Sequence, residues 1–263
     1  MRVICPLVRP VAYPGLTTRR PTTGSTGSLR HLGFSFHDKA EAFPGIVNAY
    51  AGWTFCQIQY NYMDAEYQAG TKGLEYAAAQ GLAVIAMEPL RGGALANPPS
   101  AVRRILASLP GNRSPAEWGL QWVWNHPGVS LLLSGMSSLP QVVENLQAAE
   151  EAEINSLQAG ELALITRARK KFEERTAIPC TSCGYCMPCP NGVNIPLNFE
   201  LYNTAERYED LAGSRFRYQR FMADGEKAIA CTGCRSCEEK CPQKISVSEW
   251  MPKVAAALEV DQK

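Results

Sequence analysis

The chain has 263 residues, of which 46% are hydrophobic and 19% charged, so it can bury a core and wholesale disorder is not expected. Its formal net charge is +1, which gives no overall attraction to nucleic acid or to anionic membranes. No apolar run approaches the roughly 20 residues that a membrane-spanning helix needs. We therefore expect one large domain or two modest ones, with neither nucleic acid nor membrane as a partner.

Residues 1–29 differ in composition from the rest of the chain. They contain four arginines and four prolines, and the first acidic residue of the chain is Asp38. No strand alternation and no helical period is visible in this segment. Three interpretations stay open: a disordered leader, a misassigned start, and an arginine-rich organelle transit peptide. In each of them residues 1–29 lie outside the folded domains.

From residue 30 onward, strand and helix patterns alternate. Apolar runs predict four buried strands, at 32–36, 55–62, 82–87 and 129–136. Helical patterns cover 39–51, 71–81, 100–109, 114–126 and a segment that begins at Ser138 with capping-box spacing to Gln141. Four such alternations are typical of parallel βαβ units in an α/β sheet. Residues 154–176 are helical and charged, and they predict a solvated helix face that joins two domains.

The ten cysteines are unevenly distributed. Cys5 lies in the atypical first segment and is assigned no role, whereas Cys56 lies on an apolar strand and is expected in the core. The other eight form two runs, Cys180-x2-Cys183-x2-Cys186-x2-Cys189-Pro190 and Cys231-x2-Cys234-x2-Cys237-x3-Cys241-Pro242. The start of the chain has no apolar stretch of the kind a secretory signal needs, so a reducing compartment and a cytoplasmic location are expected.

Three cysteines at two-residue spacing can surround one face of a compact iron–sulfur cluster, and a fourth thiolate must come from elsewhere. In two-cluster ferredoxins the fourth cysteine of each run binds the other cluster. That pattern implies two [4Fe–4S] clusters, one held by Cys180, Cys183, Cys186 and Cys241 and the other by Cys231, Cys234, Cys237 and Cys189. The first run departs from the usual bacterial spacing, with two residues before its last cysteine. Zinc and disulfides are the alternatives, but a zinc site would leave the middle cysteine of each run without a role.

Four segments, LRHLGFSFHD, FCQIQYNYMD, GLAVIAMEPLRGG and VSLLLSGMSSLPQVVENL, resemble the second half of an aldo/keto reductase. The segments CGYCMPCPNGVNIP and CEEKCPQ resemble the ferredoxin-type C-terminus of a bacterial branch of that family. The resemblance implies an eight-stranded (β/α) barrel of the TIM type, of which this chain supplies the last four βα units. The predicted domains are a leader at 1–29, half of a barrel at 30–176, and a mainly α-helical two-cluster ferredoxin-like domain at 177–263.

The resemblance also implies part of a nicotinamide site. Ser35 and Gln57 correspond to the residues that hold the carboxamide. The residues that correspond to the adenosine side are Ser134, Gly135, Ser137, Gln141, Glu144 and Asn145. A helix N-terminus suits phosphate, although Ser138 and Gln141 equally suit capping.

Two departures from the family pattern bear on the choice of cofactor. Met87 stands where many members stack an aromatic ring on the nicotinamide. No Lys or Arg occurs between Ser114 and Thr166, and a 2′-phosphate usually binds a cation. Arg91 could supply that cation if the fold brings it near. The predicted cofactors are two [4Fe–4S] clusters and, by resemblance, NAD(P), with NAD favoured over NADP or the site empty.

The family's catalytic Asp, Tyr, Lys and His come from the first four strands, and no segment of this chain matches them. No catalytic residue is therefore assigned, and His31, His37 and His126 are expected to be solvated or capping residues. We expect a truncated aldo/keto reductase-like oxidoreductase whose clusters pass single electrons to a redox partner protein, without carbonyl-dependent NAD(P)H oxidation of its own. A non-catalytic iron–sulfur electron carrier and an inactive gene fragment stay open as alternatives. The unpaired edges of a half-barrel predict either self-association or only marginal folding of this part of the chain.

Overall fold

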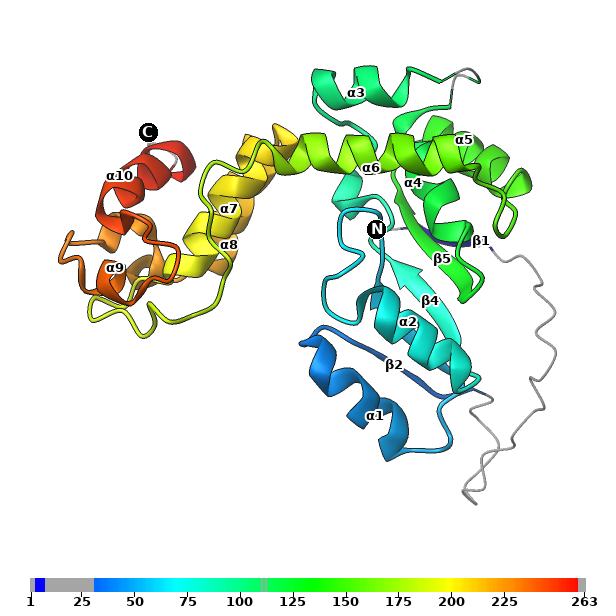
Figure 1. Ribbon diagram of the computed structural model, residues 1–263, viewed down its shortest axis with the longest axis horizontal. Coiled ribbons are helices and arrows are strands. Elements are labelled where there is room, and N and C mark those ends of the chain that lie inside the picture. Colours follow the sequence, from blue (N-terminus) through cyan, green and yellow to red (C-terminus); the bar gives the residue numbers. More distant parts are fainter. Residues whose placement is uncertain (1–2, 8–30, 110, 112, 260–263) are drawn as a thin grey trace. The chain divides into compact units, whose positions relative to one another are not determined.

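The structure is a computed structural model, and it describes residues 3–7, 31–109, 111 and 113–259 (Figure 1). Contacts divide the chain into two compact units. The first contains the described residues of Met1–Asn97 and Arg103–Arg169, and the second those of Pro98–Val102 and Lys170–Lys263. Within the described residues, no helix combines the length and the apolar character needed to cross a membrane.

The first unit is built on a five-stranded sheet with the order β1-β5-β4-β3-β2. Four of its strands are parallel neighbours: β2 (Gly33–Ser35), β3 (Phe55–Gln59), β4 (Ala83–Met87) and β5 (Val129–Met136). Each lies inside one of the four apolar runs that predicted a strand. The α/β class with four parallel strands is therefore confirmed.

Helices follow the strands at the expected places. They are α1 (Phe43–Ala49, after the 3-10 turn η1, Ala40–Ala42), α2 (Gly70–Ala79), α3 (Ser100–Leu106, after η2, Arg91–Gly93), α4 (Pro115–Trp124) and α5 (Leu139–Glu150). The start of α4 follows the predicted signal, because Ser114 Oγ accepts a hydrogen bond of 3.0 Å from Glu117 N and Pro115 occupies the first helical position.

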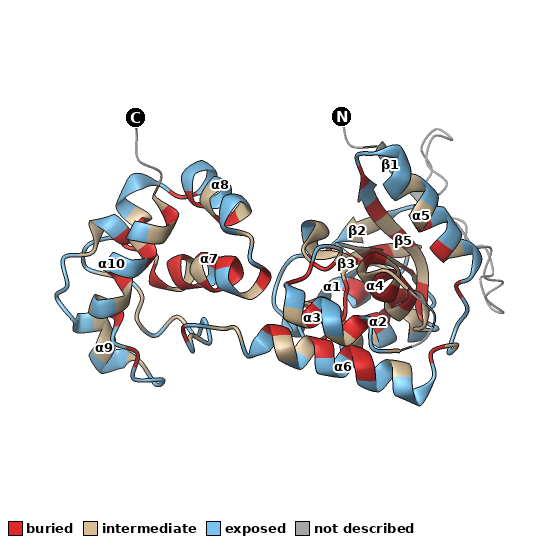
Figure 2. Ribbon diagram, turned by 90° about the horizontal axis from the view of Figure 1, so that it is seen from above, coloured by how far each residue is buried: buried red, intermediate tan, exposed pale blue. Residues whose placement is uncertain are grey.

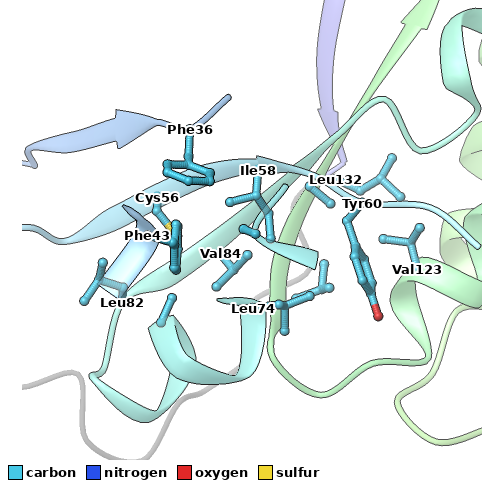
Figure 3. Close-up of a cluster of buried hydrophobic side chains, with 14 of the residues drawn as sticks. Phe36, Phe43, Cys56, Ile58, Tyr60, Leu74, Leu82, Val84, Val123 and Leu132 are labelled. Atoms are coloured by element: carbon cyan, nitrogen blue, oxygen red, sulfur yellow. The ribbon is translucent and has the colours of Figure 1, made fainter. Parts of the chain in front are cut away.

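The core of the first unit lies between the sheet and its helices (Figure 3). Alternate residues of the strands are fully buried, as Cys56 and Ile58 of β3 show. Leu74 of α2 and Val123 of α4 pack against this face from the helices. Burial raises the pKa of Cys56 to about 12, so this thiol behaves as a small apolar side chain.

Strand β1 (Val3–Leu7) corrects the expectation for the start of the chain. It pairs antiparallel with β5, from Val3 opposite Met136 to Leu7 opposite Leu132. Residues 3–7 therefore belong to the sheet, and the edge of β5 that was expected to be open is paired. The rest of the segment 1–29 lies outside the described residues.

The opposite edge of the sheet is formed by β2. In the part of the chain that the structure describes, β2 pairs with β3 and with no second neighbour. Unpaired strand edges are templates for pairing with another chain. Self-association through this edge stays a prediction.

The described part of the second unit consists of helices and turns. After α6 (Ala159–Glu173) come α7 (Ile195–Tyr208), α8 (Leu211–Phe221), η3 (Asp224–Glu226), η4 (Ala228–Ala230), α9 (Ser236–Lys240) and α10 (Val247–Leu258). Its core includes Phe199 of α7, Tyr218 of α8 and Met251 of α10. Six of the eight cysteines in the two runs pack against this core: Cys180, Cys186, Cys189, Cys231, Cys237 and Cys241.

Helix α6 has one solvated and one buried face. Arg167, Lys170 and Glu173 are exposed. The buried stripe lies at three- and four-residue spacing and consists of Leu164, Ile165, Ala168 and Phe172, so the helix is amphipathic.

His126 follows Asn125, the last residue that caps α4, and its ring fixes the turn after the helix. Gly128 N donates to His126 Nδ1 over 3.0 Å, which requires an unprotonated Nδ1. Burial lowers the pKa of His126, while the Glu75 carboxylate, 3.8 Å from Nε2, acts in the opposite direction. Because the folded-state pKa is lowered, the stabilisation is complete above the unfolded-state pKa of about 6.5 and is lost as the pH falls through the folded-state value.

We therefore expect the free energy of unfolding of the first unit, measured with urea, to fall between about pH 7.5 and about pH 5. The fall should be smaller in His126→Gln, which has no imidazole to protonate. An equal fall in the two proteins would contradict this assignment.

Candidate metal centre

A cavity in the second unit is lined by cysteines from both runs. Cys180, Cys183 and Cys186 of the first run border it together with Cys241, the last cysteine of the second run. The rest of its wall contains no charged side chain and is mostly apolar: Thr181, Gly184, Ile195, Pro196, Phe199, Pro242, Gln243, Ile245 and Val247. The structure thus brings together the four cysteines that the ferredoxin pattern implied for one cluster.

The chemistry of this donor set suits an iron–sulfur cluster. Cysteine thiolates are the ligands of such clusters, and an apolar shell limits the access of water to them. No three His, Cys, Asp or Glu side chains of the described residues converge closely enough to share a single metal ion. The thiols instead surround the cavity. The residues present therefore fit a [4Fe–4S] cluster.

The start of the first run is fixed by Asn203 of α7. Ile178 N donates to Asn203 Oδ1 over 2.9 Å, and Asn203 Nδ2 donates to Ile178 O over 2.8 Å. Cys180 N in turn donates to Ile178 O over 2.7 Å. Because Asn203 is buried, this pair of hydrogen bonds is shielded from water and holds the first cysteine at a set position on the core.

The second run is fixed by Glu238 of α9, which lies between Cys237 and Cys241. Glu238 Oε1 accepts hydrogen bonds from the backbone N and from Oγ of Ser248, both of 2.7 Å. These bonds hold the pKa of Glu238 below its usual value. Glu238 therefore ties the segment that carries the last two cysteines to the first turn of α10.

The structure links the other four cysteines less directly. Asn191, two residues after Cys189, donates from Nδ2 to Thr232 Oγ1 over 2.9 Å and to Cys234 Sγ over 3.7 Å. The loop after Cys189 therefore lies beside the second run, as its predicted role as ligand to the second cluster requires.

Crowding of the thiols shapes their acidity. Burial raises the pKa of Cys180 and Cys186, and the neighbouring thiolates of Cys183 and Cys241 raise them further. Burial also raises the pKa of Cys237 to about 11. Exposed Cys234 differs, because hydrogen bonds from Ser236 lower its pKa. Deprotonating several of these thiols together is therefore unfavourable unless a cationic metal group neutralises them.

The two residues predicted on the carboxamide side of a nicotinamide lie next to each other. Ser35 of β2 and Gln57 of β3 are opposite each other in the parallel ladder. Gln57 Nε2 donates to Met87 Sδ over 3.3 Å, and Ser35 Oγ lies 3.0 Å from His37 Nε2. Ser35 and Met87 thus end β2 and β4, and Gln57 lies in the middle of β3 between them.

The residues predicted on the adenosine side gather at the end of β5 and on α5. Buried Asn145 Nδ2 donates to buried Ser134 Oγ over 3.0 Å. Gln141 Oε1 accepts from the backbone N of Ser137 over 2.8 Å and of Ser138 over 3.2 Å. Gly135 is exposed and Glu144 partly so. Gln141 therefore performs the capping role that the sequence left open.

Two family models match the chain, one in each of two separate regions. A family model described as the aldo/keto reductase family matches residues 23–166, which is more than half of the chain. The chain belongs to the aldo/keto reductase family. A second family model, described as a 4Fe-4S dicluster domain, matches residues 179–246 and so contains both cysteine runs.

Individual relatives match the aldo/keto reductase region. An uncharacterized oxidoreductase of Schizosaccharomyces pombe is 30% identical over 123 residues, which are 47% of this chain and 38% of that protein. The solved aldo-keto reductase AKR11C1 from Bacillus halodurans has 24% identity and a TM-score of 0.43, over 53% of this chain and 50% of that one. An aldo-keto reductase from Klebsiella pneumoniae in complex with NADPH has 23% identity and a TM-score of 0.42, over 52% and 47%. The chain thus spans half or less of the length of these relatives.

A polar network in the aldo/keto reductase region was missed from the sequence. Asp64, which is almost fully buried, accepts hydrogen bonds from Gln59 Nε2 over 2.7 Å and from Asn61 Nδ2 over 2.9 Å, and it pairs with Arg91. Asn61 Nδ2 also donates to Glu88 O over 2.9 Å. The network joins the loops that follow β3 and β4. Arg91, suggested above for a ribose phosphate, is engaged with Asp64.

Proposed function

We propose that this chain is an electron-transfer oxidoreductase. Two [4Fe–4S] clusters in its second unit exchange single electrons with a redox partner protein, and its aldo/keto reductase region binds a nicotinamide. The observation that carries this proposal is the cavity lined by Cys180, Cys183, Cys186 and Cys241, since it collects thiols from two runs more than 40 residues apart.

Different side chains of the second unit bind the clusters, position the cysteines and exclude water. Cys180, Cys183, Cys186 and Cys241 bind one cluster, and Cys231, Cys234, Cys237 and Cys189 bind the other. Asn203 and Glu238 hold the two runs on the core, and apolar residues such as Phe199 exclude water from the cavity. Bound [4Fe–4S] clusters supply one-electron oxidation and reduction.

In the first unit, Ser35 at the end of β2 and Gln57 in the middle of β3 orient the nicotinamide carboxamide. NAD is the preferred cofactor, because no Lys or Arg occurs between Ser114 and Thr166 and because Arg91 pairs with Asp64. No residue of the chain matches the family's catalytic acid, so this chain does not reduce carbonyl compounds by itself.

Titration of the full chain with NADH and with NADPH, followed by nicotinamide fluorescence, tests this half of the proposal. NADH should bind more tightly than NADPH. Gln57→Leu should weaken NADH binding about fivefold, because about 1 kcal/mol is typical of one lost hydrogen bond. Gln80→Leu, an exposed residue at the end of α2, is the matched control and should bind like the parent. Equal affinity for the two dinucleotides would contradict the preference for NAD, and carbonyl-dependent oxidation of NADH would contradict the assigned lack of catalysis.

A second candidate is an iron–sulfur electron carrier that binds no nicotinamide. The observation in its favour is that Ser134, Gln141 and Asn145 already have partners within the protein. Full iron content without any nicotinamide binding would select this candidate.

A further inference from the structure

Helix α8 carries two exposed phenylalanines. Phe216 is 64% exposed and Phe221 is 70% exposed, although the same helix buries Tyr218 and Ser214 in the second core. The two rings contact each other edge to face, with their centroids 6.2 Å apart. Figure 2 shows that most of α8 is exposed or half-buried. Large aromatic side chains that gather on a protein surface are typical of sites of protein interaction, where such residues are enriched.

The charged residues of α8 itself all have one sign, and nearby Glu259 accepts a hydrogen bond of 3.1 Å from Gln219 Nε2. The sequence of α8 contains three arginines and no acidic residue. Arg215 Nε donates to Ala257 O over 2.8 Å, whereas Arg217 and Arg220 are exposed. The Arg220 guanidinium lies 5.8 Å from the centre of the Phe221 ring. Phe216, Arg217, Arg220 and Phe221, named here the α8 patch, therefore combine apolar rings with positive charge.

The acidic residues next to α8 along the chain have partners of their own. Asp210 accepts from Gly213 N over 2.8 Å, Asp224 pairs with Lys227 over 2.8 Å, and Glu226 accepts from Ala223 N over 3.1 Å. The arginines of the patch thus keep their charge available to a partner. The matching surface is acidic with an apolar centre.

Helix α8 is also joined to the second cysteine run. Ala228 N donates to Tyr218 Oη over 3.0 Å, and Ala228 begins the turn η4 that leads directly to Cys231. Met222, which follows α8, belongs to the core against which Cys231 and Cys237 pack. A protein bound to the patch would therefore be held beside the segment that carries the second run.

We infer that the α8 patch is the docking surface for an acidic protein that carries one electron at a time. This inference rests on the proposed function, because it supplies the redox partner of the clusters. The carrier docked on the patch would take one electron from, or give one electron to, a cluster held by the second unit, and no bond would be made or broken. Opposite charges speed the encounter, and the phenylalanines hold the bound carrier in place.

The test uses the full chain with its clusters and a flavodoxin of acidic surface as the probe. Iron content is measured first, the chain is reduced with dithionite and freed of excess reductant, and the rate of flavodoxin reduction is followed by stopped flow. Arg217→Glu with Arg220→Glu should slow the rate about tenfold at low salt, and the parent rate should fall as salt rises. Phe216→Ser with Phe221→Ser should raise the flavodoxin concentration at which the rate is half-maximal. The salt dependence of the rate should stay as in the parent.

The matched control is Arg103→Glu with Arg104→Glu, which reverses two exposed arginines of α3 and changes the net charge equally. An unchanged rate in this control supports docking on the patch. Docking on the patch is overturned if the α8 and the α3 charge reversals slow the rate equally. It is also overturned if neither reversal slows the rate. Binding of a single-stranded oligonucleotide that is lost in the α8 variants, with electron transfer intact, also overturns it. Absence of iron from the purified chain would contradict the proposed function. Full iron content together with a rate that the patch variants leave unchanged would contradict this inference alone.

Discussion

Replacing Cys241 with alanine is expected to halve the iron content of the protein, from about eight to about four atoms per chain. The reason is that Cys241 lines the same cavity as Cys180, Cys183 and Cys186, so its loss removes the fourth ligand of that cluster. Iron and acid-labile sulfide, measured together with visible absorbance, give the result. Cys56→Ala is the matched control, because it removes a cysteine buried in the other unit and should keep all the iron.

The same experiment distinguishes the two possible ligand arrangements. After reduction, the residual paramagnetic spectrum of Cys241→Ala should match that of Cys180→Ala. Cys189→Ala should instead match Cys231→Ala. If Cys189→Ala matched Cys180→Ala, each run would hold its own cluster and the crossed assignment would be wrong. Stoichiometric zinc in place of iron would contradict the cluster assignment altogether.

Removing the iron is expected to unfold the second unit while the first unit stays folded. Six cysteines pack against the core of the second unit, and pKa values raised by burial disfavour the thiolate state without a metal. Metal binding commonly contributes several kcal/mol or more to folding of small metal-containing units. The core of the first unit contains Cys56 and neither cysteine run.

Hydrogen exchange with mass spectrometry measures both units in one sample. After oxidation and chelation, peptides from α7, α8 and α10 should lose most of their protection, and peptides from β3, β4 and α2 should keep theirs. The holoprotein carried through the same buffers without chelator is the control. Protection of α7 and α10 that survives complete loss of iron would show that the second core is stable without its metal.

The strands and helices that sequence patterns predicted well are those with local signals. The four parallel strands are continuous apolar runs, and α4 has Ser114 and Pro115 at its start. Strand β1 had no such signal, because it is five residues long and contains Pro6. Proline cannot donate to a ladder and is confined to strand edges, and β1 is indeed an edge strand. Only the pairing with β5, more than 120 residues away, identifies it.

In the candidate site too, residues with a local sequence signal were predicted and residues whose roles depend on distant segments were not. Cysteine spacing predicts the ligands because three of each set come from one short loop. Asn203 and Glu238 were not identified, because their roles depend on Ile178 and Ser248, which the fold brings to them from other segments. The network around Asp64 was missed for the same reason, since its members belong to two loops.

The antiparallel pairing of β1 makes the two edges of the sheet unlike. A segment that added a parallel strand beside β5 would first have to displace β1. Within the described part of the chain, one edge strand is β2, parallel to its neighbour, and the other is β1, antiparallel to its neighbour. Two copies that paired β2 with β2 would join like edges about a two-fold axis. Pairing of β2 with β1 would instead join unlike edges head to tail, and only that pairing could repeat into an open-ended fibre.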